Sequence, residues 1–188
     1  MSSDLGVLIV CFGNKVKDSL FLSLLEKRYV VRILVGVKSS TLDVTGKVYF
    51  FDTIDVNVKK YDLRCILRSL IKCAYQKPPL YSSIKHHKIP LYKYARLDID
   101  VNIKRKKIIM HKIGLNIIKH NQIVLDITCS KGTYIRSVVE YLEEKLLIPM
   151  SVIQITRLSV GNFNILQSYS LSDILRFKSI SEIEQVIL

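Results

Sequence analysis

Two runs rich in β-branched residues, separated by a short polar turn, constrain the fold of this chain more than any other feature. Ile108–Ile118 and Gln122–Thr128 flank a turn at Asn121, and asparagine tolerates the backbone of a tight turn, so the pattern predicts a β-hairpin. The next segment, Thr133–Leu146, changes to apolar residues three and four apart, which predicts a helix. Together with the other elements below, this indicates an α+β fold: a mixed, mainly antiparallel sheet flanked by helices.

The remaining elements follow from the same two periodicities, of strands and of helices. In chain order they are a strand at Gly6–Phe12, a helix at Lys15–Lys27, neighbouring strands at Tyr29–Val37 and Gly46–Phe51, a helix at Leu63–Ile71 that Pro78-Pro79 ends, a strand at Val152–Val160, and two short helices that begin at Ser170 and Ser179. No internal repeat or linker interrupts this order, so we expect one domain over residues 1–188.

Composition and charge narrow the class of protein. The 188 residues include 29 Lys and Arg against 16 Asp and Glu, a net charge of +13 that favours a partner rich in negative charge. The longest uncharged stretches are well short of the ~18 apolar residues of a membrane span. The N-terminus shows no signal-peptide pattern, so we expect a cytoplasmic protein. The four cysteines are scattered, with no histidine at ligand spacing beside them, so neither a zinc site nor a disulfide framework is predicted.

The positive charge is concentrated in residues 85–119, which hold ten Lys or Arg and two acidic residues, a local charge of +8. Within this segment Tyr92 neighbours Lys93 and lies near Arg96, a mixture typical of surfaces where cations meet phosphates and aromatic rings meet bases. A block of four consecutive basic residues follows: Lys104, Arg105, Lys106 and Lys107. Charge alone leaves two interpretations open, a nucleic-acid interface and a solvated basic face on a sheet.

Four sequence blocks, in this order and spacing, resemble one family. They are Lys27-Arg28-Tyr29, the Gln-Lys-Pro-Pro-Leu-Tyr-Ser-Ser-Ile-Lys block from Gln76 to Lys85, Leu91–Arg96, and Cys129–Ser137 with its Lys-Gly-Thr-Tyr-Ile-Arg motif. The family is that of the bacterial tRNA pseudouridine synthases of the TruB type, which isomerise a uridine in the T-loop of tRNA. The resemblance implies a pseudouridine-synthase-like fold, tRNA as the partner, and a reaction without cofactor or metal. We expect the chain to act as a monomer.

The resemblance also implies roles for individual residues. In the family an aspartate attacks the flipped uridine nucleoside, and the base detaches, rotates and is rejoined through carbon. Tyr29 matches the tyrosine that stacks on the target base and is a candidate for proton removal. Tyr134 and Arg136 match a pair in which the arginine holds the catalytic carboxylate ionised and oriented. Asp43 matches an acid near the pocket, or else shapes its own turn through an Asx bond. Ile155 matches an aliphatic residue that lines the pocket.

Further residues are candidates for RNA contact. Lys17 and Arg157 match basic positions of the family, and we place both near RNA phosphates. The basic segment and the glycine-containing motif supply the other RNA-binding candidates: Lys85, Tyr92, Lys93, Arg96, Lys104, Arg105, Lys106, Lys107 and Lys131.

The family's nucleophile lies in a loop resembling Gly-Thr-Leu-Asp-Pro, shortly before Gly-Val-Leu, and this chain has Gly-Val-Leu at residues 6–8. Counting back from Gly6 puts the aspartate at Met1, and Asp4 is a weak substitute because nucleophilic geometry is lost by shifts of ~1 Å. The family's C-terminal RNA-binding domain has no counterpart either, so we expect a truncated catalytic domain. Two alternatives stay open, a non-catalytic remnant that binds tRNA or other RNA, and an enzyme that acts on ribosomal RNA.

Overall fold

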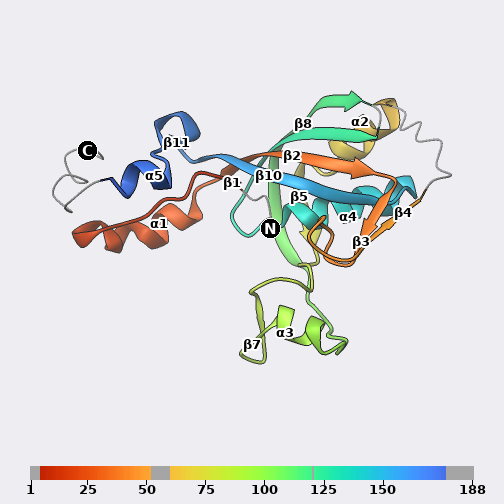
Figure 1. The fold of residues 1–188 in the computed structure, drawn as a ribbon, viewed down its shortest axis with the longest axis horizontal. Helices are drawn as coiled ribbons and strands as arrows, with labels where there is room; N and C mark the ends of the chain where they lie inside the picture. Colours follow the sequence, from red (N-terminus) through yellow and green to blue (C-terminus); the bar gives the residue numbers. More distant parts are fainter. Residues whose placement is uncertain (1–4, 52–59, 120, 177–188) are drawn as a thin grey trace.

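A seven-stranded sheet forms the centre of the computed structural model, which describes residues 5–51, 60–119 and 121–176 (Figure 1). In spatial order its strands are β1 (Leu5–Gly6), β10 (Met150–Val160), β2 (Lys27–Val35), β9 (Gln122–Cys129), β8 (Lys106–Lys119) and β5 (Lys72–Gln76), while β11 (Phe163–Asn164) pairs with β10. Among the described strands of this sheet, β1 runs parallel to β10 and the other pairs are antiparallel. The predicted α+β class with a mixed, mainly antiparallel sheet is confirmed.

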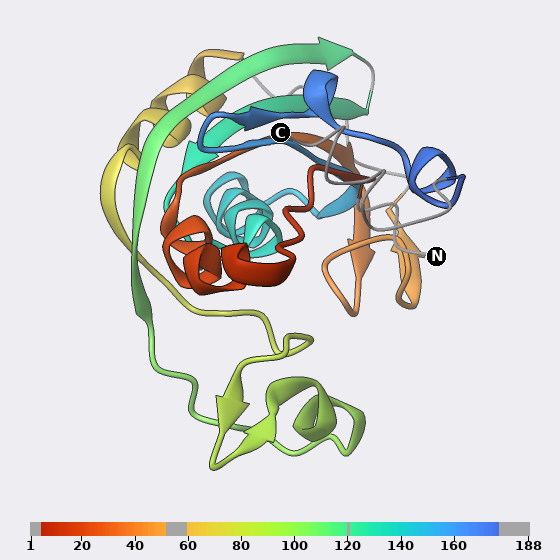
Figure 2. The ribbon, with the colours of Figure 1, turned by 90° about the vertical axis from the view of Figure 1, so that its left-hand side faces the viewer.

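The predicted hairpin is formed by β8 and β9, and β9 shows how the sheet makes a core. Its residues alternate between buried and partly exposed, so that Leu125 and Ile127 point to one face and are fully buried there. Helices α4 (Ile135–Leu146) and α2 (Lys60–Ser69) contribute to the same cluster, and α4 lies in the hollow of the curved sheet (Figure 2). Burying one such side chain stabilises the fold by about 1.5–3 kcal/mol, so this cluster fixes the position of α4 on the sheet.

The N-terminal segment differs from its prediction. The expected strand at Gly6–Phe12 is reduced to β1, and the expected helix consists of a 3₁₀ turn, η1 (Gly13–Asp18), and a short helix, α1 (Ser19–Leu24). Leu20 and Phe21 of α1 are 73% and 65% exposed. The apolar periodicity that predicted this helix therefore does not mark a face buried against the described residues.

The second expected strand pair is also only partly formed. The chain turns at Gly36, where φ is +81°, and β3 (Val37–Ser39) then pairs with β4 (Val48–Phe50) in a separate two-stranded sheet. The longer run before Gly36 is β2, whose neighbours are β9 and β10. The two long strands β9 and β10 take up the edges of β2, so the predicted pairing of Tyr29–Val37 with Gly46–Phe51 holds only for Val37, the last residue of the run.

Helix α2 ends at Ser69, well before the two prolines that we expected to end it. Leu70 and Ile71 continue its apolar periodicity, but their N–H groups donate to the carbonyls of Leu67 and Arg68 in a closing turn. The next residues form β5, the outer strand beside β8. The sequence prediction missed this strand because helical spacing of apolar residues extends beyond the helix itself.

Between β5 and β8 the chain leaves the sheet and forms a small group of elements, which lies below the main body in Figure 1. These are the strands β6 (Lys85–His86) and β7 (Ile89–Pro90), paired as a hairpin, and the helix α3 (Leu91–Arg96). A separate hydrophobic cluster holds the group together, formed by Ile84, Leu91, Tyr94, Val101 and Ile103. We refer to residues 84–103 as the outlying unit; its elements were not predicted.

The last described elements follow β10. They are η2 (Ile165–Gln167) and α5 (Leu171–Ile174), and a capping box between Ser170 and Asp173 begins α5, as predicted. The helix predicted from Ser179 and the candidate Asp4 lie outside the described residues. Within the described ranges, no helix combines the length and apolar character needed to cross a membrane.

Candidate active site

One cavity, of about 440 Å³, opens beside the start of α4, and we refer to it as the central cavity. Tyr29 reaches it from β2, Ile155 and Arg157 from β10, and Tyr134 and Arg136 from the start of α4. Tyr29 and Arg157 are cross-strand partners in the β2–β10 pair, which explains why they lie together. Further lining residues are Leu5, Gly6, Leu8, Thr133 and Ile135. Five residues selected from the sequence therefore line one cavity.

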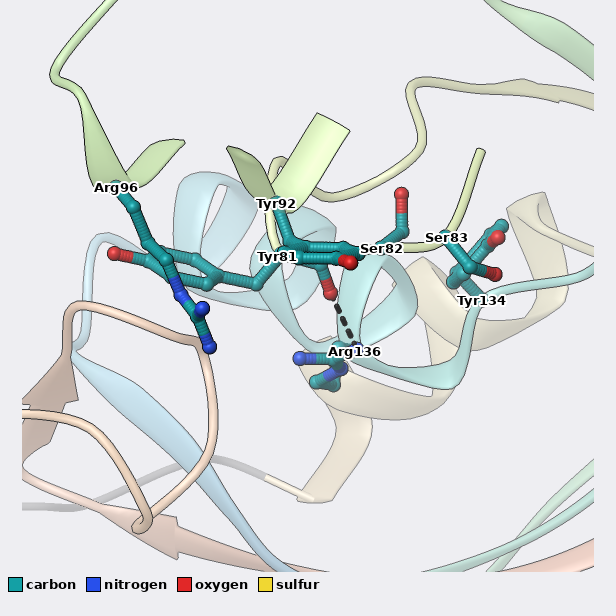
Figure 3. A pocket seen from close by; sticks show the side chains of 7 residues that line it. All are labelled: Tyr81, Ser82, Ser83, Tyr92, Arg96, Tyr134 and Arg136. Carbon is teal, nitrogen blue, oxygen red and sulfur yellow. Dashed lines mark hydrogen bonds between the residues drawn. The ribbon is translucent and has the colours of Figure 1, made fainter. Parts of the chain in front are cut away.

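The Arg136 guanidinium joins three segments of the chain at this cavity. Its Nη1 donates to the carbonyl oxygen of Thr41 and to Oδ2 of Asp43, both at 3.3 Å, and its Nη2 donates to the carbonyl oxygen of Tyr81 at 2.9 Å (Figure 3). The Arg136 and Asp43 side chains are only 23% and 18% exposed. At such exposure water screens the ion pair less than at the surface, so the guanidinium is held in one orientation.

Asp43 both shapes its own turn and pairs with Arg136. Its Oδ1 accepts hydrogen bonds from the Thr45 N–H at 3.0 Å, from the Thr41 hydroxyl at 2.9 Å and from the Thr45 hydroxyl. The turn is fixed to β10 by two backbone bonds of 3.0 Å, in which Val152 accepts from Val44 and donates to Leu42. One carboxylate oxygen of Asp43 thus forms the expected Asx bond of the turn, and the other contacts Arg136, which lines the central cavity.

One wall of the central cavity is formed by the backbone of β1 against β10. Gly6 has a φ of +115°, and a Cβ at this position would overlap the backbone of Arg157, so glycine is needed for this close approach. Arg157 Nε donates to the carbonyl oxygen of Val7 at 2.6 Å, and the Val7 N–H donates to the Arg157 carbonyl at 2.9 Å. The side chain and backbone of Arg157 together hold this wall.

Cations gather at the start of β2. Burial lowers the pKa of Lys27, and the nearby cations Arg157 and Lys131 lower it further. The Lys27 Nζ donates to the carbonyl oxygens of Ser23 at 2.5 Å and Leu25 at 2.6 Å, which closes the C-terminal end of α1. Positive charge of this density near a cavity favours an anion such as an RNA phosphate.

A second cavity, of about 370 Å³, is also lined by Arg136, and we refer to it as the adjacent cavity. Its lining residues, drawn in Figure 3, are Tyr81, Ser82, Ser83, Tyr92, Arg96, Tyr134 and Arg136. It shares Tyr134 and Arg136 with the central cavity, and Arg96 lies over the Tyr92 ring, with its Cζ 5.4 Å from the ring centroid. The outlying unit thus contributes an aromatic ring and a cation beside the residues of the central cavity.

The other candidate RNA-binding residues line neither of these two cavities. Lys17 is exposed on η1, Lys85 on β6, Lys93 on α3 and Lys131 in the turn before α4. The four-residue basic block is exposed as well, with Lys104 and Arg105 before β8 and Lys106 and Lys107 at its start. These exposed side chains therefore stay candidates for RNA contact outside the two cavities.

Three residues that hold the site were not selected from the sequence for this role: Thr41, Gln76 and Tyr81. Thr41 and Tyr81 supply carbonyl oxygens to Arg136, and Gln76 bonds to the backbone of Tyr134. Gln76 and Tyr81 belong to the motif block from Gln76 to Lys85, and this membership was the sequence feature that could have pointed to them. Their partners are more than 50 positions away in the sequence, so local patterns could not reveal these contacts.

Comparisons with known proteins identify the family to which this chain is similar. The model of the family described as TruB family pseudouridylate synthase (N terminal domain) matches residues 3–135. The chain is 37% identical over 158 residues to the tRNA pseudouridine synthase B of Wigglesworthia glossinidia brevipalpis, covering 84% of this chain and 48% of the relative. It is 41% identical over 160 residues to that of Blochmanniella pennsylvanica, covering 84% of this chain and 60% of the relative. The chain thus spans about half the length of these relatives.

The fold is similar to that of a chain in the crystal structure of a Cbf5-Nop10-Gar1 complex, with a TM-score of 0.66 and 18% sequence identity. The similarity covers 98% of this chain and 46% of the other. A chain in the archaeal box H/ACA sRNP Nop10-Cbf5 complex is similar in the same way, with a TM-score of 0.63 and 16% identity. These likenesses concern the fold of the described sheet and helices.

Proposed function

The chain belongs to the TruB family of pseudouridylate synthases, and on this premise we propose that it isomerises uridine to pseudouridine in the T-loop of tRNA. The observation that carries the proposal is the central cavity, where Tyr29, Tyr134, Arg136, Ile155 and Arg157 meet from three different elements. The relatives named tRNA pseudouridine synthase B support tRNA as the substrate rather than ribosomal RNA.

The cavity residues fit the steps of this reaction. A uridine that has left its stack loses favourable contacts, and an aromatic face replaces them, so Tyr29 is placed to stack on the base. A carboxylate attacks the nucleoside, the bond from the sugar to nitrogen breaks, and the base rotates. A bond from the sugar to carbon then forms, the bond to the carboxylate breaks and releases it, and the carbon loses its proton. Tyr29 is the candidate for removing this proton. Arg136, oriented by Asp43, is placed to hold the attacking carboxylate ionised.

The basic residues outside the cavities fit a role in holding the RNA. Lys85, Lys93 and the block 104–107 lie in or beside the outlying unit, which also carries Tyr92 and Arg96. Cations and aromatic rings on one surface suit the phosphates and unpaired bases of an RNA loop. We propose that this unit contacts the RNA, and that the protein works as a monomer in the cytoplasm.

The test is the release of tritium from tRNA transcript labelled at C5 of uridine. It is run on the 188-residue chain and on a form in which added Gly-Thr-Leu precedes Met1→Asp and Ser2→Pro, so that a carboxylate is present at the position inferred from the sequence. The proposal is supported if the form with the added carboxylate releases tritium and its Arg136→Ala variant does not. Salt-sensitive tRNA binding without release by either form supports a non-catalytic RNA-binding protein instead.

A further inference from the structure

The side chain of Gln76 bonds to the main chain of Tyr134, a residue that lines both cavities. Gln76 is the last residue of β5, and its Nε2 donates to the Tyr134 carbonyl oxygen at 2.9 Å while its Oε1 accepts from the Tyr134 N–H at 2.8 Å. Both hydrogen-bonding groups of one residue's backbone are therefore engaged by a single amide, in the manner of a neighbouring strand.

Tyr134 lies at the boundary between the turn at Gly132 and helix α4, and its carbonyl oxygen also accepts from the Val138 N–H of the helix at 3.3 Å. It is the N-cap of α4, with an extended φ of −94° and ψ of 112°, and no side chain caps the helix there. Gly132, two residues earlier, has a φ of +77° with open space around it. The Gln76 amide thus gives the Tyr134 N–H its acceptor and adds a second, shorter bond to the Tyr134 carbonyl, in a residue that lines both cavities.

Two neighbouring residues of α4 also bond to the segment that follows Gln76. The Ser137 hydroxyl donates to the Lys77 carbonyl at 2.9 Å, and Arg136 donates to the Tyr81 carbonyl at 2.9 Å. The start of α4 is therefore held along the connection from β5 to the outlying unit. Because shifts of ~1 Å at a reacting group lower rates strongly, the residue that sets the Tyr134 backbone also sets the cavity geometry.

We propose that Gln76 is a positioning residue, which holds Tyr134 in the orientation that receives the target uridine; this rests on the proposed function. The role demands a primary amide, because only such a side chain presents a donor and an acceptor side by side to one N–H and one C=O group. Methionine has a similar length and neither group. Glutamate keeps the acceptor for the Tyr134 N–H but, when ionised, turns an oxygen toward the Tyr134 carbonyl.

The experiment compares Gln76→Met, Gln76→Glu and the unsubstituted full chain in binding two T-arm hairpin RNAs, one with uridine and one with an abasic residue at the target position. In Gln76→Met we expect affinity for the uridine hairpin to fall roughly tenfold and affinity for the abasic hairpin to stay within about twofold. Hydrogen exchange at the Tyr134 amide should become faster in Gln76→Met and stay slow in Gln76→Glu. Gln154→Met, on β10 and outside both cavities, is the matched control and should change neither readout.

Equal loss of affinity for both hairpins in Gln76→Met overturns the proposal, because a residue that only stabilises the fold does not distinguish the two RNAs. No loss for either hairpin overturns it too, because Gln76 then has no effect on uridine binding. Slow Tyr134 exchange in Gln76→Met overturns it as well. Failure of the proposed function gives a different result. If the unsubstituted chain does not prefer the uridine hairpin, that function is wrong. The proposed role of Gln76 is then wrong as well, even if hydrogen exchange shows that its contact with Tyr134 is intact.

Discussion

The main sheet and the outlying unit differ in how firmly they are packed and in what they carry. Among the described residues, 18 buried side chains form the cluster between the sheet and its helices, whereas three form the cluster of the outlying unit. The main sheet carries Tyr29, Ile155 and Arg157, which line the central cavity. The outlying unit carries exposed cations and Tyr92, for which we propose contacts with RNA through charge and stacking.

Under the proposed function, the groups that need accurate placement lie on the part with the larger hydrophobic cluster, and the proposed RNA contacts lie on the part with the smaller one. Bond rearrangement tolerates little displacement of the groups that perform it, so these belong on a densely packed sheet. Phosphate contacts fall off gradually with distance and adapt to a moving partner, so a lightly packed unit is sufficient for them. The measurements below test this separation, beginning with the largest expected effect.

Leu125→Ala should destabilise the whole molecule. Leu125 is fully buried at the centre of β9, and removing such a side chain from a dense core lowers the free energy of unfolding by about 2–5 kcal/mol. Urea denaturation followed by circular dichroism measures the change. Leu91→Ala, at the centre of the small cluster, is the counterpart and should shift the main transition by less than about 1 kcal/mol, because that cluster opens locally. Equal losses would show that the two regions unfold as one unit.

Arg136→Lys should lower kcat/KM by roughly 10²–10³, equivalent to about 2.7–4 kcal/mol, in the form that releases tritium. A lysine ammonium keeps the charge, but it cannot reach Thr41, Asp43 and Tyr81 from one planar group as the guanidinium does. Affinity for tRNA should change little. Retention of more than about a tenth of the activity would contradict a role for this geometry.

Replacing the four basic residues 104–107 by glutamine should weaken RNA binding and leave turnover at saturating RNA unchanged. If each contacts a phosphate, the slope of log affinity against log salt concentration should fall by roughly 3–4. Fluorescence anisotropy with a labelled T-arm hairpin at several salt concentrations measures it. Lys145→Gln, at the end of α4, is the control and should leave the slope unchanged. An unaltered slope in the fourfold variant would remove this block from the RNA interface.

The rate of thiol alkylation should also differ between a buried cysteine of the main sheet and one of the outlying unit. Burial raises the pKa of Cys129 to about 11, so at pH 8 the thiol stays protonated and alkylation is slow. The pKa of Cys129 is higher in the folded state than its ordinary value of 9. The free energy of unfolding therefore falls as the pH rises from 9 to 11 and the thiol ionises. In a Val101→Cys variant, a buried thiol of the outlying unit should react at least about tenfold faster than Cys129 through local opening. Mass spectrometry after timed iodoacetamide treatment measures both rates, and equal rates would argue against separate opening.

How far the sequence predicted the fold depends on whether burial follows a local pattern. The hairpin of β8 and β9, helix α4 and strand β10 were predicted because residues such as Leu125 and Leu142 recur with the period of their element. Strand β5 was missed because Leu70 and Ile71 prolong a helical pattern into a turn. The outlying unit was missed because Leu91 joins Val101 and Ile103 across an irregular segment.

The candidate site was predicted through motif resemblance rather than periodicity. Tyr29, Tyr134 and Arg136 were selected because their blocks resemble a family, and nothing in their local spacing requires a shared cavity. The contacts that hold them could not be predicted in this way. The hydrogen bonds of Gln76 and of the Thr41 carbonyl join residues far apart in the sequence, and only the packed sheet brings them together.

The pairing of Gln76 with Lys106 has a consequence for the way this protein can change. The two residues are cross-strand partners at the ends of β5 and β8, so the chain leaves and re-enters the sheet at the same point. Residues 77–105 therefore have the architecture of an insertion, whose ends are already joined by the register of β5 on β8. A graft of another length or composition at this point leaves the sheet continuous. Within this insertion, Lys77 and Tyr81 hold the start of α4 through their carbonyl oxygens, so a graft that begins after Tyr81 would replace the outlying unit and keep these contacts of the central cavity.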